Sequence, residues 1–469
     1  MKVLLIDPPM FVMIEQHKNY FPYGLCSMAT LLRQKGYDAS VYDADHTTTL
    51  HSKSFKEIAE SYDRYLEEDT FNKHPIWSQM AAFLEEFKPD LVGVSTLPVK
   101  YRSVKKTVQI VRAMSPNAKI VVGGRHATSN PEIFFALPEV DFVVRGEGEQ
   151  TILDLCDLID SAADISLYRK VLGLSYRDNM EVRNNQSRSP ICDLDQIPYP
   201  DRSTLVNQQY YTHQDLGMIL SSRGCPFQCT FCAIYQLWGR GIHYRSIPHV
   251  MAEIHEVIEN YGVHYFSFRD SVFTINEKRV LELCSSIIKS NLPIQWECMT
   301  RMDLMSEQVL EQMKEGGCSI IRVGIESGSP RILEHIRKNI SIDQIRTIAK
   351  LLHKYEFYWA AYFIFGTPTE TEDDIIQTLE LIKDIDPPFV TMSSFEPVEG
   401  TEMYYEANQL GLIGDNDKIY ANRQSIGKCY SSCITQKRYQ ELMTEVSEFI
   451  QRHNKKNAIY TLRIRRLEN

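Results

Sequence analysis

RGCPFQCTFC, residues 223–232, places three cysteines in one short stretch with the spacing C-x3-C-x2-C. Thiolates at Cys225, Cys229 and Cys232, carried on one tight loop, can hold three irons of a [4Fe–4S] cube. Electron-carrying ferredoxins supply four cysteines, whereas here one iron is left without a protein ligand. An open iron on a reducing cluster is what the reductive cleavage of S-adenosylmethionine requires.

Two other interpretations of the three cysteines stay open. A structural zinc site takes four ligands, and the next soft ligand, His243, stands alone in the sequence eleven residues after Cys232. Alternatively, the three thiols are unrelated buried side chains. The neighbouring Gly224 and Pro226 are typical of a turn rather than of a core strand, so the sequence favours the open cluster.

The composition bounds the class of protein. The 469 residues suffice for two or three domains, and 43% of them are hydrophobic. A net charge of −10 argues against a nucleic-acid partner, which needs a basic surface. The 11 scattered cysteines, with no secretory leader, indicate reduced thiols and a cytoplasmic location. The apolar run Val3–Ile6 is far too short for a signal peptide or a membrane span.

Residues 1–150 are expected to form a doubly wound, Rossmann-like α/β domain. Short apolar runs predict its strands over Val3–Ile6, Ala39–Tyr42, Asp90–Ser95, Ala118–Val122 and Val140–Val144. A helix from about Gly24 to Lys35 separates the first two. This alternation indicates a parallel sheet, and ligands of such sheets bind at the carboxyl ends of the strands.

Residues 208–405 are expected to form six strand–helix units. The predicted strands are Met218–Ser222, Tyr265–Arg269, Ile294–Thr300, Ile320–Ile325, Tyr358–Phe365 and Val390–Phe395. Six units rather than eight predict an open, partial (β/α)6 barrel of the TIM type, with its chemistry at the strand carboxyl ends. Residues 151–207 are expected to be a linker that can add a small β-element, and residues 406–469 a helical tail.

Several residues that follow these strands are candidates for the site. Asp270 can bind a cofactor or a substrate, and Arg301 can clamp a carboxylate with two hydrogen bonds, with a surface ion pair as the alternative. Glu326 ends an apolar strand, so its carboxylate can accept hydrogen bonds from a diol; a capping or salt-bridged glutamate is the alternative. Gly366 and Pro368 form a Gly-x-Pro turn that can also serve topology alone.

The order of these motifs resembles the radical S-adenosylmethionine (SAM) superfamily, and within it the cobalamin-binding group, over residues 1 to about 405. The resemblance implies that the three cysteines hold a [4Fe–4S] cluster and that Phe231 packs near the adenine of SAM. It also implies that Glu326 contacts the ribose and that the turn from Gly366 to Pro368 lies by the adenine. The reaction implied is cleavage of SAM to a 5′-deoxyadenosyl radical that abstracts hydrogen from an unactivated carbon.

The first 150 residues resemble the cobalamin-binding domain that precedes many radical enzymes. Ser95-x-Leu97 and, some 25 residues later, Gly123-Gly124 carry this resemblance. A glycine pair lets the backbone approach a flat macrocycle, and a small hydroxyl at Ser95 can face the nucleotide tail. The nearest match to the cobalt-ligating motif D-x-H-x-x-G, residues 43–46, lacks the glycine, so His46 is not assigned as a cobalt ligand. A scaffold that no longer binds a corrin is the alternative.

The leading functional prediction is cobalamin-dependent methylation of a carbon in a small-molecule or natural-product intermediate. Dehydration, deoxygenation or cyclisation without methyl transfer is a second enzymatic interpretation. A non-catalytic cobalamin or metal sensor belongs to another class, and it has no use for the SAM motifs. The expected partners are a small-molecule substrate and a reductant such as flavodoxin or ferredoxin, with no nucleic acid and no membrane span.

Overall fold

A computed structural model of the chain describes all residues except 17, 19, 47–54, 180, 415–427 and 457–469. Parts of the predicted helical tail, 406–469, therefore lie outside the described residues. The chain divides into two compact units. Unit 1 comprises Met1–Leu216 and Ile234–Gly239, and unit 2 comprises Gly217–Ala233 and the described residues from Arg240 onward.

Unit 1 is built on a seven-stranded sheet in the order β2-β1-β3-β4-β5-β6-β7 among the described residues. Its strands are β1 (Lys2–Asp7), β2 (Asp38–Asp43), β3 (Leu91–Ser95), β4 (Lys119–Gly123), β5 (Phe142–Val144), β6 (Leu174–Asp178) and β7 (Glu181–Asn184). The first five strands pair in parallel, whereas β6 and β7 are antiparallel. The order reverses between β1 and β3, which is where doubly wound sheets bind ligands.

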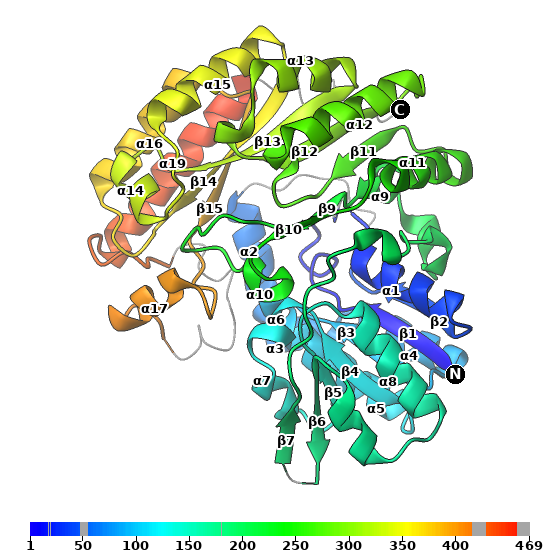
Figure 1. The fold of residues 1–469 in the computed structure, drawn as a ribbon. Coiled ribbons are helices and arrows are strands. Elements are labelled where there is room, and N and C mark those ends of the chain that lie inside the picture. Colours follow the sequence, from blue (N-terminus) through cyan, green and yellow to red (C-terminus); the bar gives the residue numbers. More distant parts are fainter. Residues whose placement is uncertain (17, 19, 47–54, 180, 415–427, 457–469) are drawn as a thin grey trace. The chain divides into compact units, whose positions relative to one another are not determined.

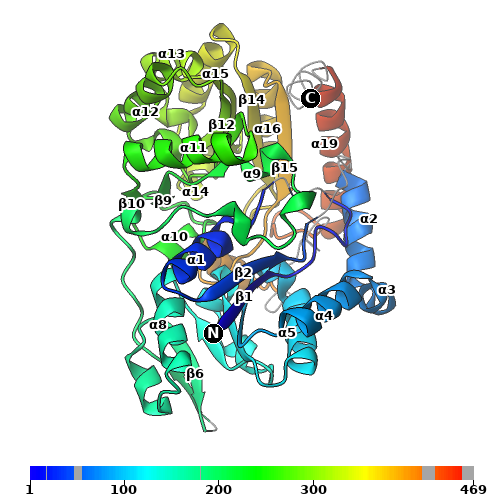
Figure 2. The same ribbon diagram turned by 90° about the vertical axis from the view of Figure 1, so that its right-hand side faces the viewer.

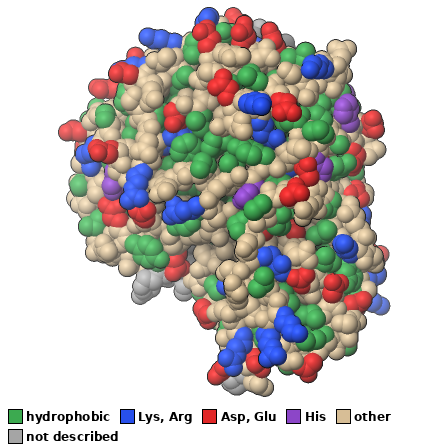
Figure 3. All heavy atoms as spheres, in the orientation of Figure 1, with side chains coloured by type: hydrophobic (Ala, Val, Ile, Leu, Met, Phe, Trp, Pro, Cys, Tyr) green, Lys and Arg blue, Asp and Glu red, His purple; other side chains and the backbone are tan. Residues whose placement is uncertain are grey.

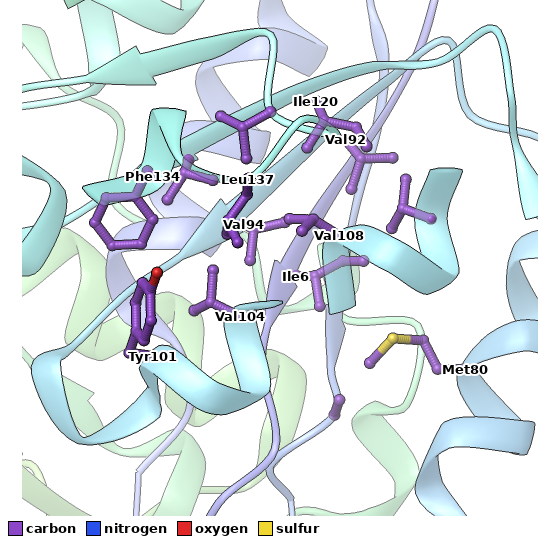
Figure 4. Close-up of a cluster of buried hydrophobic side chains, with 14 of the residues drawn as sticks. Ile6, Met80, Val92, Val94, Tyr101, Val104, Val108, Ile120, Phe134 and Leu137 are labelled. Carbon is purple, nitrogen blue, oxygen red and sulfur yellow. The ribbon is translucent and has the colours of Figure 1, made fainter. Parts of the chain in front are cut away.

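Helices and a buried apolar cluster cover the sheet of unit 1. The helices are α1 (Tyr23–Gln34), α2 (Phe55–Leu66), α3 (Glu68–Lys73), α4 (Ile76–Phe87), α5 (Tyr101–Met114), α6 (Arg125–Ser129), α7 (Glu132–Phe135), α8 (Glu149–Asp160), α9 (His213–Leu216) and α10 (Ile234–Trp238). In Figure 4, Ile6 and Val94 of the sheet face Val104 and Val108 of α5. Burying these side chains stabilises the sheet that carries the strand ends.

Unit 2 contains a six-stranded sheet in the order β15-β14-β13-β12-β11-β8. Its strands are β8 (Met218–Ile219), β11 (Tyr265–Phe268), β12 (Gln295–Thr300), β13 (Cys318–Glu326), β14 (Tyr358–Phe365) and β15 (Phe389–Ser394), all paired in parallel. The spatial order of these strands follows their order in the chain, as in an open barrel. The predicted fold class is therefore confirmed: a doubly wound domain, a partial (β/α)6 barrel and a helical C-terminal region.

Helices cover one face of the sheet of unit 2 (Figures 1 and 2). The helices of this unit, as far as it is described, are α11 (Ile247–Tyr261), α12 (Glu277–Lys289), α13 (Glu307–Glu315), α14 (Pro330–His335), α15 (Ile342–Lys354), α16 (Glu372–Ile385), α17 (Glu402–Gln409) and α19 (Gln436–Lys456). Side-chain caps set several of their starts: Ser341 and Thr371 each form a capping box, at α15 and α16. The loops between strand and helix carry the candidate site.

One hairpin departs from the sequence-based expectation, and a second lies in the segment for which a small β-element was allowed. The strand predicted over Met218–Ser222 is split, because β9 (Ser222–Gly224) leaves the six-stranded sheet and pairs antiparallel with β10 (Ile242–Tyr244). The segment predicted as a linker that can add a small β-element contains most of α8 and the hairpin β6–β7, which extends the sheet of unit 1. The domain boundaries given above stay a prediction.

Two features of the structure concern the partners expected from the sequence: the distribution of charge on the surface and the length and apolar character of the helices. On the face shown in Figure 3, acidic and basic side chains are interspersed. Within the part of the chain that is described, no helix is both long and apolar enough to cross a bilayer.

Candidate active site and cofactor-binding residues

The cysteine loop begins directly after β9, which ends at Gly224. This residue has a φ of +92°. A Cβ atom there would lie 2.3 Å from the carbonyl oxygen of Gly241, the residue that directly precedes β10. Only glycine fits this close approach of two backbones. Further along, Thr230 N–H donates to Ile336 O at 3.1 Å, and Thr230 O accepts from Met403 N–H at 3.1 Å. The loop is therefore fixed at both its start and its middle.

All three cysteines of the loop are partly buried. Burial raises the pKa of the Cys225 thiol, and the N–H of Phe227 partly offsets this. No group of three or more His, Cys, Asp or Glu side chains among the described residues is arranged to hold a single metal ion. A cube does not require such convergence, because each thiolate binds a different iron. Three thiols on one loop are a donor set that fits a [4Fe–4S] cube with one open iron.

The other cysteines of the barrel lie elsewhere. Cys298 and Cys318 are 1% and 2% exposed and neighbour each other in the core, where they pack as small hydrophobic side chains. Cys429 and Cys433 hydrogen-bond to backbone carbonyls of their own segment and of Thr369.

Arg301, which follows β12, lies against the cysteine loop. Its Nη1 donates to Cys229 Sγ at 3.8 Å, and its guanidinium lies 3.8 Å from the centre of the Phe227 ring. Asp303 accepts two hydrogen bonds from the same guanidinium, at 2.9 and 3.0 Å. Arg301 therefore clamps the carboxylate of Asp303, a residue of the same chain. The predicted binding of a SAM carboxylate by Arg301 stays a prediction.

Glu326 ends β13 in a left-handed backbone conformation, with a φ of 75°. A bulge in the pairing with β14 precedes it, and a Cβ atom at Gly324 would lie 2.3 Å from Glu326 Oε1. The carboxylate is buried and accepts from Lys338 Nζ at 2.7 Å. The carbonyl of Lys338 accepts in turn from Arg301. Lys338 therefore joins Glu326 to Arg301, a link that no sequence spacing indicates.

Asp270, which follows β11, holds the strand end that precedes the loop. Its carboxylate accepts from the N–H of Ser221 at 2.7 Å, from Ser221 Oγ at 2.5 Å and from Ser222 Oγ at 2.9 Å. Burial raises its pKa, and these hydrogen bonds oppose that shift. The structure thus shows Asp270 positioning β9, and the predicted contact with cofactor or substrate stays a prediction.

The Gly-x-Pro turn follows β14 and is fixed by residues that the sequence did not single out. Gly366 has a φ of +83°, and a Cβ atom there would lie 2.6 Å from the hydroxyl of Tyr439 in α19. Its N–H donates to Glu370, and burial raises the pKa of Glu370 to about 8. Pro368 O accepts from Ser432 N–H at 2.8 Å. Phe231 is half-buried on the cysteine loop.

The structure brings the predicted cobalamin residues together in unit 1. Ser95 ends β3 opposite Gly123, which ends β4, and Leu97 is 37% exposed just beyond. Gly124 has a φ of +110°, and a Cβ atom there would lie 2.9 Å from Thr96 O. The glycine therefore allows two adjacent strand ends to approach closely, at an edge suited to a planar ligand. Binding by these four residues stays a prediction.

A buried network of charges fixes the neighbouring strand ends of unit 1. Lys18 Nζ contacts Asp7 at 2.6 Å and Asp43 at 2.7 Å, and Lys100 Nζ contacts Asp7 at 2.6 Å and Asp45 at 2.8 Å. Burial opposes the charge on Asp7, but the two lysines lower its pKa to about 2. Asp43 and Asp45 belong to the nearest match to the cobalt-ligating motif, and here they bind lysines.

His46, the last residue of that match, packs against an aromatic pair in unit 1. Its ring centroid lies 4.4 Å from that of Tyr211 and 5.8 Å from that of Tyr210.

The chain matches known proteins along most of its length. Residues 219–382 match the family model of the radical SAM superfamily, and residues 11–155 match the B12 binding domain. An uncharacterised methyltransferase of Pyrococcus horikoshii is 31% identical over 418 residues, which cover 88% of this chain and 84% of that protein. The anaerobic magnesium-protoporphyrin IX monomethyl ester cyclase of Cereibacter sphaeroides is 27% identical over 359 residues, covering 75% of this chain and 58% of that protein.

A solved structure supports the same architecture. The radical S-adenosylmethionine methyltransferase TsrM from Kitasatospora setae, with cobalamin and a [4Fe–4S] cluster bound, matches with a TM-score of 0.69 at 17% identity. The match covers 94% of this chain and 81% of that one. The fold and the three-cysteine loop define a radical SAM enzyme with an N-terminal B12-binding domain, and the chain belongs to the cobalamin-binding group of that superfamily. Its cofactors are a [4Fe–4S] cluster, SAM and cobalamin.

Proposed function

We propose that this enzyme methylates a carbon atom of a small molecule, with cobalamin as the methyl carrier. The observation that carries the proposal is the pairing of a three-thiol loop in unit 2 with a B12-binding domain in unit 1. The similarity to a methyltransferase over 84% of that protein's length supports methyl transfer. When bound, the cluster supplies the electron that cleaves SAM to a 5′-deoxyadenosyl radical, and cobalamin supplies the methyl group.

The residues of unit 2 have separate tasks in this proposal. Cys225, Cys229 and Cys232 bind three irons and leave the fourth for the amino and carboxylate groups of SAM. Arg301 and Lys338 place positive charge beside the loop, held by the carboxylates of Asp303 and Glu326 respectively. The predicted adenine and ribose contacts of Phe231, Glu326 and the Gly366–Pro368 turn orient SAM. Asp270 fixes the strand end from which the loop starts.

The proposed stoichiometry balances with two molecules of SAM per product. One is cleaved reductively and yields methionine and 5′-deoxyadenosine, which carries away a hydrogen atom of the substrate. The other gives up its methyl group and yields S-adenosylhomocysteine. Two electrons enter from a reductant, for which flavodoxin or ferredoxin is the expected type.

The test is a product assay on anaerobically reconstituted enzyme with SAM, a reductant and hydroxocobalamin. We expect both 5′-deoxyadenosine and S-adenosylhomocysteine. Cys229→Ala should abolish release of 5′-deoxyadenosine, whereas Cys433→Ala, an exposed cysteine outside the loop, should retain it. Release of 5′-deoxyadenosine by Cys229→Ala at the native rate would refute the assignment of the loop.

Ring closure is the second candidate, favoured by the 27% identity to a cyclase. That reaction needs no methyl donor. Formation of 5′-deoxyadenosine without S-adenosylhomocysteine would therefore favour it over methyl transfer, and absence of both products would favour a sensor.

A further inference from the structure

A charged network occupies the face of the six-stranded sheet that the helices do not cover. Glu297 of β12 lies at its centre and accepts from Ser267 Oγ at 2.7 Å and from Tyr265 Oη at 3.2 Å. Arg322 of β13 donates to Glu297 Oε2 from Nη2 at 2.6 Å and from Nε at 3.1 Å. Arg269, which follows β11, places Nη2 3.5 Å from Glu297 Oε1.

Strand alternation separates this inner face from the apolar one. Trp296 and Cys298, the neighbours of Glu297 in β12, are 0% and 1% exposed. The indole N–H of Trp296 donates to Gly316 O, just beyond α13, so this side chain points toward the helices. By contrast, the side chains of Arg269 and Arg322 are 22% and 24% exposed. The two arginines are therefore partly exposed to solvent on the inner face.

The hydrogen-bond capacity of Arg269 is not used up within the chain. Arg322 uses its Nε and Nη2 on Glu297 and its Nη1 on Tyr362 Oη, which accepts at 3.0 Å. Arg269 Nε, in contrast, is buried and has no hydrogen-bond partner among the residues that the structure describes. A buried N–H without an acceptor is unfavourable, and a guanidinium presents its Nε–H and an Nη–H side by side to a carboxylate or a phosphate.

The charges within the Glu297 network also leave a positive excess. The network contains two arginines and one carboxylate. Burial raises the pKa of Glu297, but the two arginines lower it by more, so the pKa lies below its ordinary value and the carboxylate is ionised. Arg301 with Asp303, and Lys338 with Glu326, form two balanced pairs beside the cysteine loop. Glu297 is thus shared by the two arginines, and it accepts hydrogen bonds from Arg322 rather than from Arg269.

We propose that the substrate carries an anionic group, a carboxylate or a phosphate, and that Arg269 binds it. Glu297, with Oε1 3.5 Å from Nη2, holds the guanidinium of Arg269 at the carboxyl end of β11, where barrel enzymes bind their substrates. The proposal rests on the proposed function in one respect, namely that the substrate binds at this inner face of the sheet. It deepens that function by naming the substrate's chemical class.

The test measures binding of small anions by the complete enzyme. Reconstituted enzyme, saturated with SAM so that the open iron is occupied, is titrated with inorganic phosphate and with acetate; acetamide serves as the uncharged counterpart of acetate. We expect weak, roughly millimolar binding of at least one anion and none of acetamide. Whichever anion binds more tightly identifies the group as phosphate or carboxylate.

Arg269→Gln should weaken anion binding about tenfold or more. The matched control is Arg346→Gln, which removes one positive charge from an exposed arginine of the same unit and should bind as the native enzyme does. If Arg269→Gln does not fold, Arg269→Lys keeps the charge but loses the Nε–H donor, and should weaken binding severalfold.

Three results would overturn the proposal. The first is the absence of binding of either anion, and the second is unchanged affinity in the Arg269 variant. The third is a tenfold loss of affinity for SAM in Arg269→Gln, since Arg269 would then bind the cofactor's own carboxylate. These outcomes are separate from the proposed function, because anion binding needs no turnover. Products without anion binding would refute only the substrate class.

Discussion

At the scale of single residues, Arg301 offers a way to alter the cluster without removing a ligand. Its Nη1 donates to Cys229 Sγ, and Asp303 fixes the guanidinium. Hydrogen bonds and positive charge near a cluster's sulfurs favour its reduced form. Arg301→Gln should therefore lower the reduction potential by roughly 50 mV, the equivalent of about a tenfold change for one electron. The measurement is a redox titration monitored by electron paramagnetic resonance.

The control for this titration is Arg346→Gln. In the native enzyme the exposed guanidinium of Arg346 pairs with Asp384, and both residues are far from the cysteine loop in the sequence. Its potential should equal that of the native enzyme. A native potential in Arg301→Gln, with four irons still bound, would show that the arginine does not influence the cluster.

Glu370 makes a pH-dependent contribution to stability. Burial raises the pKa of Glu370 from 4.5 to about 8, although the N–H of Gly366 opposes the shift. The folded chain holds this proton up to about pH 8, whereas the unfolded chain releases it near pH 4.5. The free energy of unfolding therefore falls as pH rises through this range, by up to about 1 kcal/mol per pH unit.

Glu370→Gln removes this titration but keeps an oxygen that accepts from Gly366. Its melting temperature should therefore rise relative to that of the native enzyme as the pH is raised from 5 to 8. Glu380→Gln, at an exposed position in α16, the helix that follows Glu370, should follow the native profile. A constant difference between Glu370→Gln and the native enzyme at all pH values would contradict the assignment.

At the scale of elements, α19 closes the outer edge of the barrel sheet. Asn454 accepts from Val390 N–H and donates to Val390 O, both at 2.9 Å, as a neighbouring strand would. His453 also hydrogen-bonds to Pro387 O at 2.7 Å. These contacts satisfy part of the exposed edge of β15, which otherwise offers unpaired backbone groups.

Asn454→Ala should therefore destabilise unit 2 by about 1–2 kcal/mol, because two backbone groups lose their partner. We expect a fall in melting temperature of roughly 2–6 °C. Lys455→Ala, an exposed neighbour, should leave the melting temperature unchanged. Equal melting temperatures for the Asn454 variant and the native enzyme would show that α19 does not support this edge.

At the scale of the whole molecule, the predicted cofactor sites belong to separate units. Gly124→Ala introduces a Cβ atom 2.9 Å from Thr96 O at a φ of +110°, and should weaken cobalamin binding about tenfold while leaving four irons per chain. Absorbance of bound cobalamin and iron analysis measure both. Gly36→Ala is the matched control, since its φ is +90° but nothing lies within 4 Å of the added atom. Loss of cobalamin by both variants alike would argue against a site at Gly124.

Much of this architecture could be predicted from local sequence. Apolar runs that end in glycine or a polar residue located the main strands, as for Ile320–Ile325 inside β13. The hairpin β6–β7 was not resolved as part of the sheet, because Glu181–Asn184 is polar and short and gains its structure only by pairing. The cysteine loop was found from spacing alone. Contacts such as Lys338 with Glu326 depend on the tertiary fold, and no spacing rule reveals them.

The central claim is that the cysteine loop holds a [4Fe–4S] cluster whose fourth iron takes SAM. Electron paramagnetic resonance of the reduced, anaerobically reconstituted enzyme, with and without SAM, tests it most directly. We predict about four irons per chain and a cluster signal that changes when SAM is added. A chain that binds no cluster, or a cluster whose signal is indifferent to SAM, would contradict the account.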